Sequence, residues 1–221
     1  MNDSFTLITS QMFLKALGET LTMLGFGLAF GSILGIIIGT VLAVTRTGGI
    51  LPVPWLYTVL GTIVNVIRAL PFIVLLVAIL PFTRLIVGTS IGVWAAIVPL
   101  TVMIAPYIGR LVENSLLEVP RGVIEAARAM GATPAQIFWR FLLPEARGSL
   151  ILAVTIATVG LIDASAMAGT VGAGGIGDLA LSYGYQRYDA FAMVVTCVTL
   201  VALVMTIQFV GNALARRYRR R

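Results

Sequence analysis

One acidic residue of this chain lies in an apolar segment, where a charged side chain is energetically unfavourable. Asp163 lies inside the apolar run from Gly148 to Ala168, and a charge held in a bilayer costs about 3 kcal/mol on insertion scales. In a helix that starts at Arg147, Asp163 lies about 24 Å from the start. We expect its side chain to face a water-filled path, where it contributes to ligand recognition or gating. Two structural alternatives remain: an ion pair with Arg68, and a protonated carboxyl group bonded to a neighbouring carbonyl.

The rest of the residue inventory excludes most enzymatic chemistry. The chain has no histidine, a single lysine at position 15 and a single cysteine at position 197. These counts exclude histidine acid–base chemistry, a His–Cys metal cluster and a Walker A loop. An intramembrane enzyme would need a nucleophile with its base, or a second intramembrane aspartate. We therefore expect no catalytic residue, no metal site and no cofactor, and a chain that is no enzyme and cannot hydrolyse ATP by itself.

One glycine motif imitates a nucleotide site. Residues 172–177 read Gly-Ala-Gly-Gly-Ile-Gly and satisfy the pattern G-x-G-x-x-G. That fingerprint requires a preceding strand and an acidic residue about 20 positions further on. Here an apolar run of helix length precedes it, and Asp178 and Asp189 fall at the wrong distances. We interpret residues 169–187 as a flexible outer loop instead.

The elements that position these residues are membrane helices. The chain is 59% hydrophobic and 11% charged, with a mean hydropathy of +1.02, and apolar runs of about 20 residues are typical of membrane spans. We predict an all-α integral membrane protein whose 221 residues form one transmembrane domain (1–221). The five expected spans are approximately residues 17–44, 61–80, 91–108, 148–168 and 188–215. The segment 110–147 is expected to lie outside the membrane.

Charge sets the expected orientation. The net charge of +6 would suggest nucleic acid for a soluble protein, but the arginines cluster at the ends of apolar segments, so we expect no nucleic-acid partner. One side of the predicted bundle carries eleven arginines and the other three basic residues. The eleven are Arg46, Arg110, Arg121, Arg128, Arg140, Arg147, Arg216, Arg217, Arg219, Arg220 and Arg221; the three are Lys15, Arg84 and Arg187. The positive-inside rule therefore predicts an outer N-terminus and a cytoplasmic C-terminus.

The sequence of the cytoplasmic stretch 121–146 predicts two short helices. Gly131 is expected to end the first helix in the left-handed conformation. Thr133 then reads as the N-cap of the second, with Pro134 at its first position and Gln136 at the capping-box spacing. Pro144 is expected to stop that second helix. The product would be a bent knob outside the membrane.

The first expected span carries a regular glycine pattern. Gly27, Gly31, Gly35 and Gly39 recur at every fourth residue and predict a helix face that packs closely against another helix.

For Arg68 we expect a structural role, bonding the carbonyls freed near Pro71 or lipid phosphates, and contact with a substrate is the alternative. Residues 81–90 are expected to form a tight outer loop, and the prolines at 99 and 106 to break the third span.

The knob resembles the EAA loop of ABC importer permeases. The resemblance is carried by Glu125, Ala126, Ala127 and Gly131, and by the later Ile137 and Leu143-Pro144. It implies a coupling helix that docks into a cleft on a separate ATPase subunit. The small alanines would allow close approach, while Glu125 and Arg128 would fix the register. A capped amphipathic helix lying on the membrane surface is the structural alternative.

Over most of its length the chain is similar to permeases of methionine importers. Segments that carry the likeness include residues 71–76 (PFIVLL), 129–134 (AMGATP), 165–167 (SAM) and 171–175 (VGAGG). The resemblance implies a homodimer in the bacterial inner membrane, two cytoplasmic ABC ATPase subunits, an extracytoplasmic substrate-binding protein and alternating access. It also implies that Met167, beside Ser165, narrows an outer gate.

Asp163 departs from the uncharged residues expected of methionine permeases at this position, so a cationic or polar amino acid remains an alternative cargo. A self-contained channel or secondary transporter is the rival from another class. It would need neither an EAA loop nor a second polypeptide.

Overall fold

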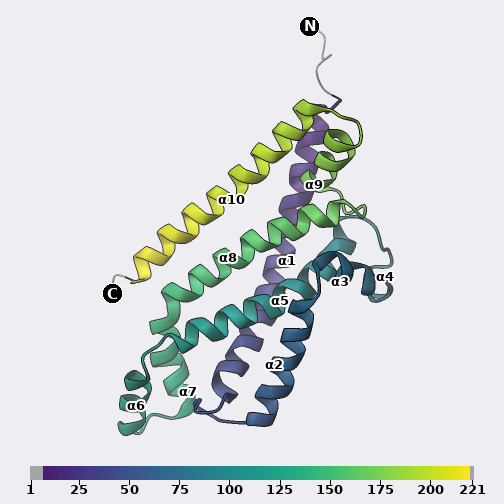
Figure 1. Cartoon of the computed structure of the whole chain (residues 1–221). Helices are drawn as coiled ribbons and strands as arrows, with labels where there is room; N and C mark the ends of the chain where they lie inside the picture. The colour runs from purple at the N-terminus through teal and green to yellow at the C-terminus, as the bar shows by residue number, and fades with distance from the viewer. Residues whose placement is uncertain (1–6, 220–221) are drawn as a thin grey trace. The chain divides into compact units, whose positions relative to one another are not determined.

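The computed structural model describes residues 7–219, and within that range every regular element is a helix (Figure 1). The elements are α1 (Ser10–Thr45), α2 (Pro54–Ala69), α3 (Phe72–Ala78), α4 (Leu80–Val87), α5 (Val93–Leu117), α6 (Arg121–Ala129), α7 (Pro134–Gln136), the π-helix Ile137–Leu142, α8 (Leu143–Gly169), α9 (Gly175–Leu179), the π-helix Ala180–Tyr185 and α10 (Ala190–Arg219). Four helices of the described range are long and apolar enough to cross a membrane, or five if α2 and α3 count as one broken span. The predicted all-α membrane fold is confirmed.

The described residues form two compact units. The first contains residues 7–31, 70–104 and 158–207, and the second contains residues 32–69, 105–157 and 208–219. The four long helices each contribute residues to both units.

In the first unit, α9 is held against α1. The backbone N–H of Gly175 donates to Glu19 Oε2 at 2.8 Å, and that of Ile176 donates to Thr20 Oγ1 at 2.9 Å. Ile176 is fully buried, in a cluster with Ala16 and Leu179. The expected flexible loop at 169–187 is therefore wrong in its middle, where α9 and a π-helix stand. The glycines that suggested flexibility permit close packing instead, since α9 meets α8 where Gly177 lies against Ala166.

In the second unit, α1 packs closely on α5. Gly35 and Gly39 are both buried. A Cβ added to Gly35 would lie 2.6 Å from Ile108 Cβ, and one added to Gly39 would lie 2.7 Å from Val112 Cβ. Gly27 and Gly31 continue the same buried face in the first unit, where Gly27 lies against Leu100 of α5 and Leu161 of α8.

Three expectations based on proline are wrong. α5 runs unbroken through Pro99 and Pro106, as apolar helices allow when neighbours satisfy the freed carbonyls. Pro144 does not stop a helix, because α7, the π-helix and α8 continue into one another as a single helix of 36 residues, Pro134–Gly169. Pro81 stands at the start of α4, so residues 81–87 are helical rather than a loop, and Gly88 ends that helix with φ +81°.

Candidate functional site: the coupling segment, a polar α2–α5 contact and the exposed face of α8

The coupling segment, residues 118–142, is built in the second unit from α6, α7 and the following π-helix. Glu125 and Ala126 are exposed on α6, whereas Ala127 is fully buried. Gly131 follows with φ +76°, and no atom lies within 4 Å of the place a Cβ would take. Conformation rather than space therefore requires glycine here.

The predicted capping box is confirmed. Thr133 Oγ1 accepts the backbone N–H of Gln136 at 3.3 Å, and Gln136 Oε1 accepts that of Thr133 at 2.9 Å. Pro134 occupies the first turn of α7. The two reciprocal bonds satisfy backbone donors that a helix start otherwise leaves free, so the bend after Gly131 is defined by its own residues.

Arg128 is bonded within the chain. Its Nη2 donates to the carbonyl oxygen of Gly49 at 3.0 Å and lies 3.4 Å from that of Ile50. The sequence suggested that Arg128 would fix the register of a partner. The geometry attaches it instead to the loop between α1 and α2.

Two large apolar side chains are exposed on the coupling segment beside Glu125. Met130 is 70% exposed and Trp139 is 65% exposed, and Glu125 is exposed on the same segment. Exposed Met and Trp are typical of the anchors in protein interfaces. This segment can therefore bind a folded partner.

In the first unit, Asp163 and Met167 lie one turn apart on an exposed face of α8. Met167 is 36% exposed. Among residues 7–219, Asp163 has neither a hydrogen-bond nor an ion-pair partner. Ser165 points the other way: it is buried, and its hydroxyl donates to the carbonyl oxygen of Ile162 at 2.8 Å. The three candidate path residues therefore divide into an exposed pair and a serine that supports its own helix.

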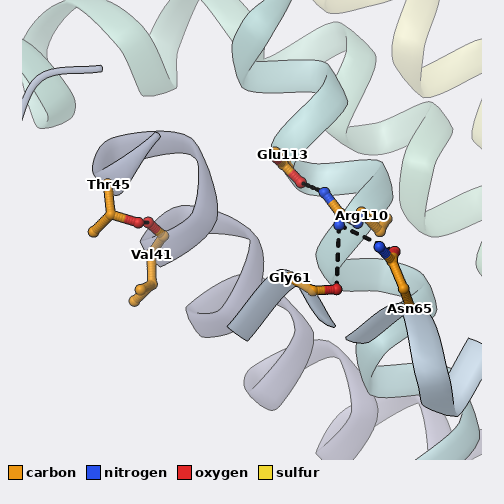
Figure 2. Close-up of polar contacts among 6 residues, drawn as sticks. All are labelled: Val41, Thr45, Gly61, Asn65, Arg110 and Glu113. Atoms are coloured by element: carbon orange, nitrogen blue, oxygen red, sulfur yellow. Dashed lines mark hydrogen bonds and ion pairs between the residues drawn. The ribbon is translucent and has the colours of Figure 1, made fainter. Parts of the chain in front are cut away.

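Sequence reasoning missed a polar contact in the second unit. Arg110 of α5 donates to Glu113 Oε2 at 2.6 Å and to Asn65 Oδ1 of α2 at 3.0 Å, and its Nη2 lies 3.4 Å from the carbonyl oxygen of Gly61 (Figure 2). Glu113 is buried. The signal was present in the spacing of Arg110 and Glu113, but both were assigned to a segment outside the helix, which in fact continues to Leu117.

Arg68 takes part in the same α2–α5 contact. Its guanidinium carbon lies 5.7 Å from the centre of the Tyr107 ring, a cation–π distance. This contact gives Arg68 a structural partner on α5, although neither the expected carbonyls near Pro71 nor a lipid is that partner.

Comparisons with known proteins agree with this architecture. The family of binding-protein-dependent transport system inner membrane components matches residues 13–221. The probable D-methionine transport system permease protein MetI of Vibrio cholerae is 51% identical over 210 residues, which cover 95% of this chain and 93% of that protein. The D-methionine transport system permease protein MetI of Escherichia coli K12 is 52% identical over 158 residues, 72% of this chain and 73% of that protein.

Solved structures give the same result. One of the methionine ABC transporter MetNI, in an inward-facing conformation, has a TM-score of 0.93 at 49% identity and covers 99% of both chains. An amino acid ABC transporter crystallised with histidines has a TM-score of 0.78 at 19% identity, with 94% of both chains covered. The second likeness is one of fold alone.

Proposed function

Because the chain belongs to the family of binding-protein-dependent transport system inner membrane components, we propose that it is the permease subunit of an ATP-driven methionine importer. The relatives that support methionine as cargo carry D-methionine in their names and align with nearly the whole chain. The protein is a multi-pass subunit of the bacterial inner membrane. It is not itself an enzyme, since a separate subunit hydrolyses ATP.

The assembly is a homodimer of this chain with two cytoplasmic ABC ATPase subunits, supplied by an extracytoplasmic binding protein. The likeness to the MetNI transporter supports this assembly. The docking element is the coupling segment. Exposed Glu125 and Ala126 face the ATPase, and the left-handed Gly131 sets the angle between α6 and α7. Arg128 contributes from within the chain by fixing α6 to the α1–α2 loop.

The cargo passes the exposed face of α8. Met167 narrows the outer gate, and Asp163 offers a carboxylate to the α-ammonium group of the amino acid. Ser165 keeps α8 regular beneath them. The exposure of Asp163 and Met167 on one face supports these roles, and a charge in a membrane helix is expected to face water or a partner.

The whole chain acts as one permease domain with its N-terminus outside and its C-terminus in the cytoplasm. The distribution of basic residues supports this orientation. It places the coupling segment on the side where ATP is available. The glycine face of α1 serves helix packing within this domain.

A single observation carries the proposal: a capped, bent segment with an exposed Glu-Ala face stands between long apolar helices in a chain half identical to D-methionine permeases. The test is genetic. A methionine-requiring bacterium that lacks its own methionine importer should grow on D-methionine when it expresses this chain with its ATPase subunit and binding protein. It should not grow when any of the three is omitted.

Competition defines the cargo in the same cells. Unlabelled methionine should displace labelled D-methionine, whereas arginine and lysine should not. Growth without the ATPase subunit would instead indicate a self-contained transporter. Displacement by a cationic amino acid would replace methionine by a different cargo.

A further inference from the structure

Two arginines cross between α2 and α5 in opposite directions. Arg110 of α5 bonds Asn65 of α2, and Arg68 of α2 stacks on Tyr107 of α5. In both helices the paired residues are three positions apart, so each pair lies on one helix face. All four residues belong to the second unit. The two helices are therefore joined by polar contacts at two successive turns.

The geometry at Arg110 is specific. Gly61 allows the approach, because a Cβ there would lie 3.3 Å from Arg110 Nη2. The side chains of Arg110 and Glu113 are 19% and 2% exposed, so Glu113 needs its cation close by. The ion pair aims the planar guanidinium at α2, where it bonds Asn65 Oδ1 at 3.0 Å. An apolar contact would hold two helices together equally well, but a directed polar contact defines a single register between them.

Both helices of this pair are attached to the coupling segment. The chain runs from the end of α5 at Leu117 to the start of α6 at Arg121. The loop that precedes α2 accepts hydrogen bonds from Arg128 of α6, through the carbonyls of Gly49 and Ile50. A displacement of α6 therefore acts on α5 through the backbone and on α2 through Arg128.

We propose that Arg110 is a positioning residue for coupling, which locks α2 to α5 through Asn65 so that both helices follow the coupling segment as one body. The inference rests on the function proposed above. Without the lock, ATP hydrolysis still displaces the coupling segment, but α2 no longer follows α5, and turnovers occur without transport.

The test removes the Asn65 side-chain acceptor and leaves the Arg110–Glu113 pair intact. Asn65 is exposed, so Asn65→Leu should assemble with the ATPase subunit like the wild type. In proteoliposomes with the complete complex and its binding protein, it should hydrolyse roughly tenfold more ATP per methionine imported, the factor that corresponds to one lost hydrogen bond to a charged group. Asn65→Asp keeps an acceptor for Arg110 and should stay close to the wild-type ratio.

The matched control is Thr62, which lies three residues before Asn65 on α2. Thr62 is exposed on α2, and its hydroxyl bonds only the carbonyl of Thr58 in its own helix. Thr62→Val should leave the ratio of ATP to methionine unchanged. A wild-type ratio in an assembled Asn65→Leu complex would overturn the proposal, and so would loss of assembly in both Asn65 variants, because that result assigns the contact to folding alone. Failure of the proposed function would appear separately, as absence of ATP-dependent uptake by the wild type.

Discussion

Asp163 and Met167 are the two exposed side chains of α8 that we propose line the path of the cargo, and they suit different parts of it. A thioether suits any apolar cargo side chain, whereas a carboxylate selects for a positive charge. Every free amino acid carries an α-ammonium group, so Asp163 is compatible with methionine. We propose that it binds the α-ammonium end that all amino acids share, and that discrimination between cargo side chains lies elsewhere.

Substituting Asp163 by asparagine tests this assignment. Asp163→Asn keeps the shape and removes the charge, so the apparent affinity for methionine should fall roughly tenfold, as for one lost charge-assisted bond, while co-purification of the ATPase subunit stays unchanged. The measurement is uptake of labelled methionine as a function of concentration. Asp178→Asn is the control, since Asp178 is bonded to Ser182 in the α9 region. Equal affinity in the wild type and Asp163→Asn would remove Asp163 from the path.

Gly131 tests the bend of the coupling segment. Gly131→Val forces a β-branched residue into φ +76°, which costs about 1–2 kcal/mol, and should lower ATP-dependent uptake and co-purification of the ATPase subunit together. Gly131→Asn should retain most of both, because asparagine tolerates the left-handed region. Normal uptake by the valine variant would show that the bend is not needed for docking.

Among the helices, ends set by polar residues and glycine were predictable from the sequence, whereas the effect of proline within apolar segments was not. Thr133, Gln136 and Gly131 act through hydrogen bonds and backbone angles within the segment. Their effect on the helix ends can therefore be predicted from the local sequence. Pro99 and Pro106 break no helix; membrane helices tolerate proline when their surroundings satisfy the freed carbonyls, and the local sequence does not reveal those surroundings. The α9 region was missed for the same reason: its bonds to Glu19 and Thr20 join residues 156 positions apart.

In the candidate site, too, local features were predictable and long-range contacts were not. The capping box and the left-handed Gly131 were predicted from residue types and spacing, and the coupling role of Glu125 and Ala126 stays a prediction. The contact of Arg110 with Asn65, which spans 45 positions, was not predicted. No periodicity predicts which of two helices brings a partner to a buried ion pair. The intramolecular bond of Arg128 was likewise hidden, since its acceptors are backbone carbonyls.

The glycine face of α1 gives a prediction about stability. Gly39→Ala should lower the midpoint of thermal unfolding in detergent, because the new methyl group would overlap Val112 and the backbone of Gly109, and overpacking costs about 1–3 kcal/mol. Gly25→Ala on the same helix is the control, since nothing lies within 4 Å of its Cβ position. Equal midpoints for both variants would show that α1 yields at this contact without cost.

The proposed import function requires that the whole molecule take one orientation in the membrane. In a Cys197→Ser background, single substitutions Ser10→Cys, Thr133→Cys and Ala213→Cys report the outer end, the coupling segment and the end of α10. The distribution of basic residues predicts that an impermeant thiol reagent applied to intact cells labels only the first. Labelling of the cysteine at position 133 from outside would contradict the orientation and the docking of a cytoplasmic ATPase.

As proposed above, this chain imports methionine while another subunit hydrolyses ATP. The most direct measurement is accumulation of labelled D-methionine in proteoliposomes that contain the permease, its ATPase subunit and its binding protein. We expect accumulation against a gradient with ATP on the side of the coupling segment, and none with a non-hydrolysable analogue or without the ATPase subunit. Accumulation by the permease alone, driven by an ion gradient, would contradict it.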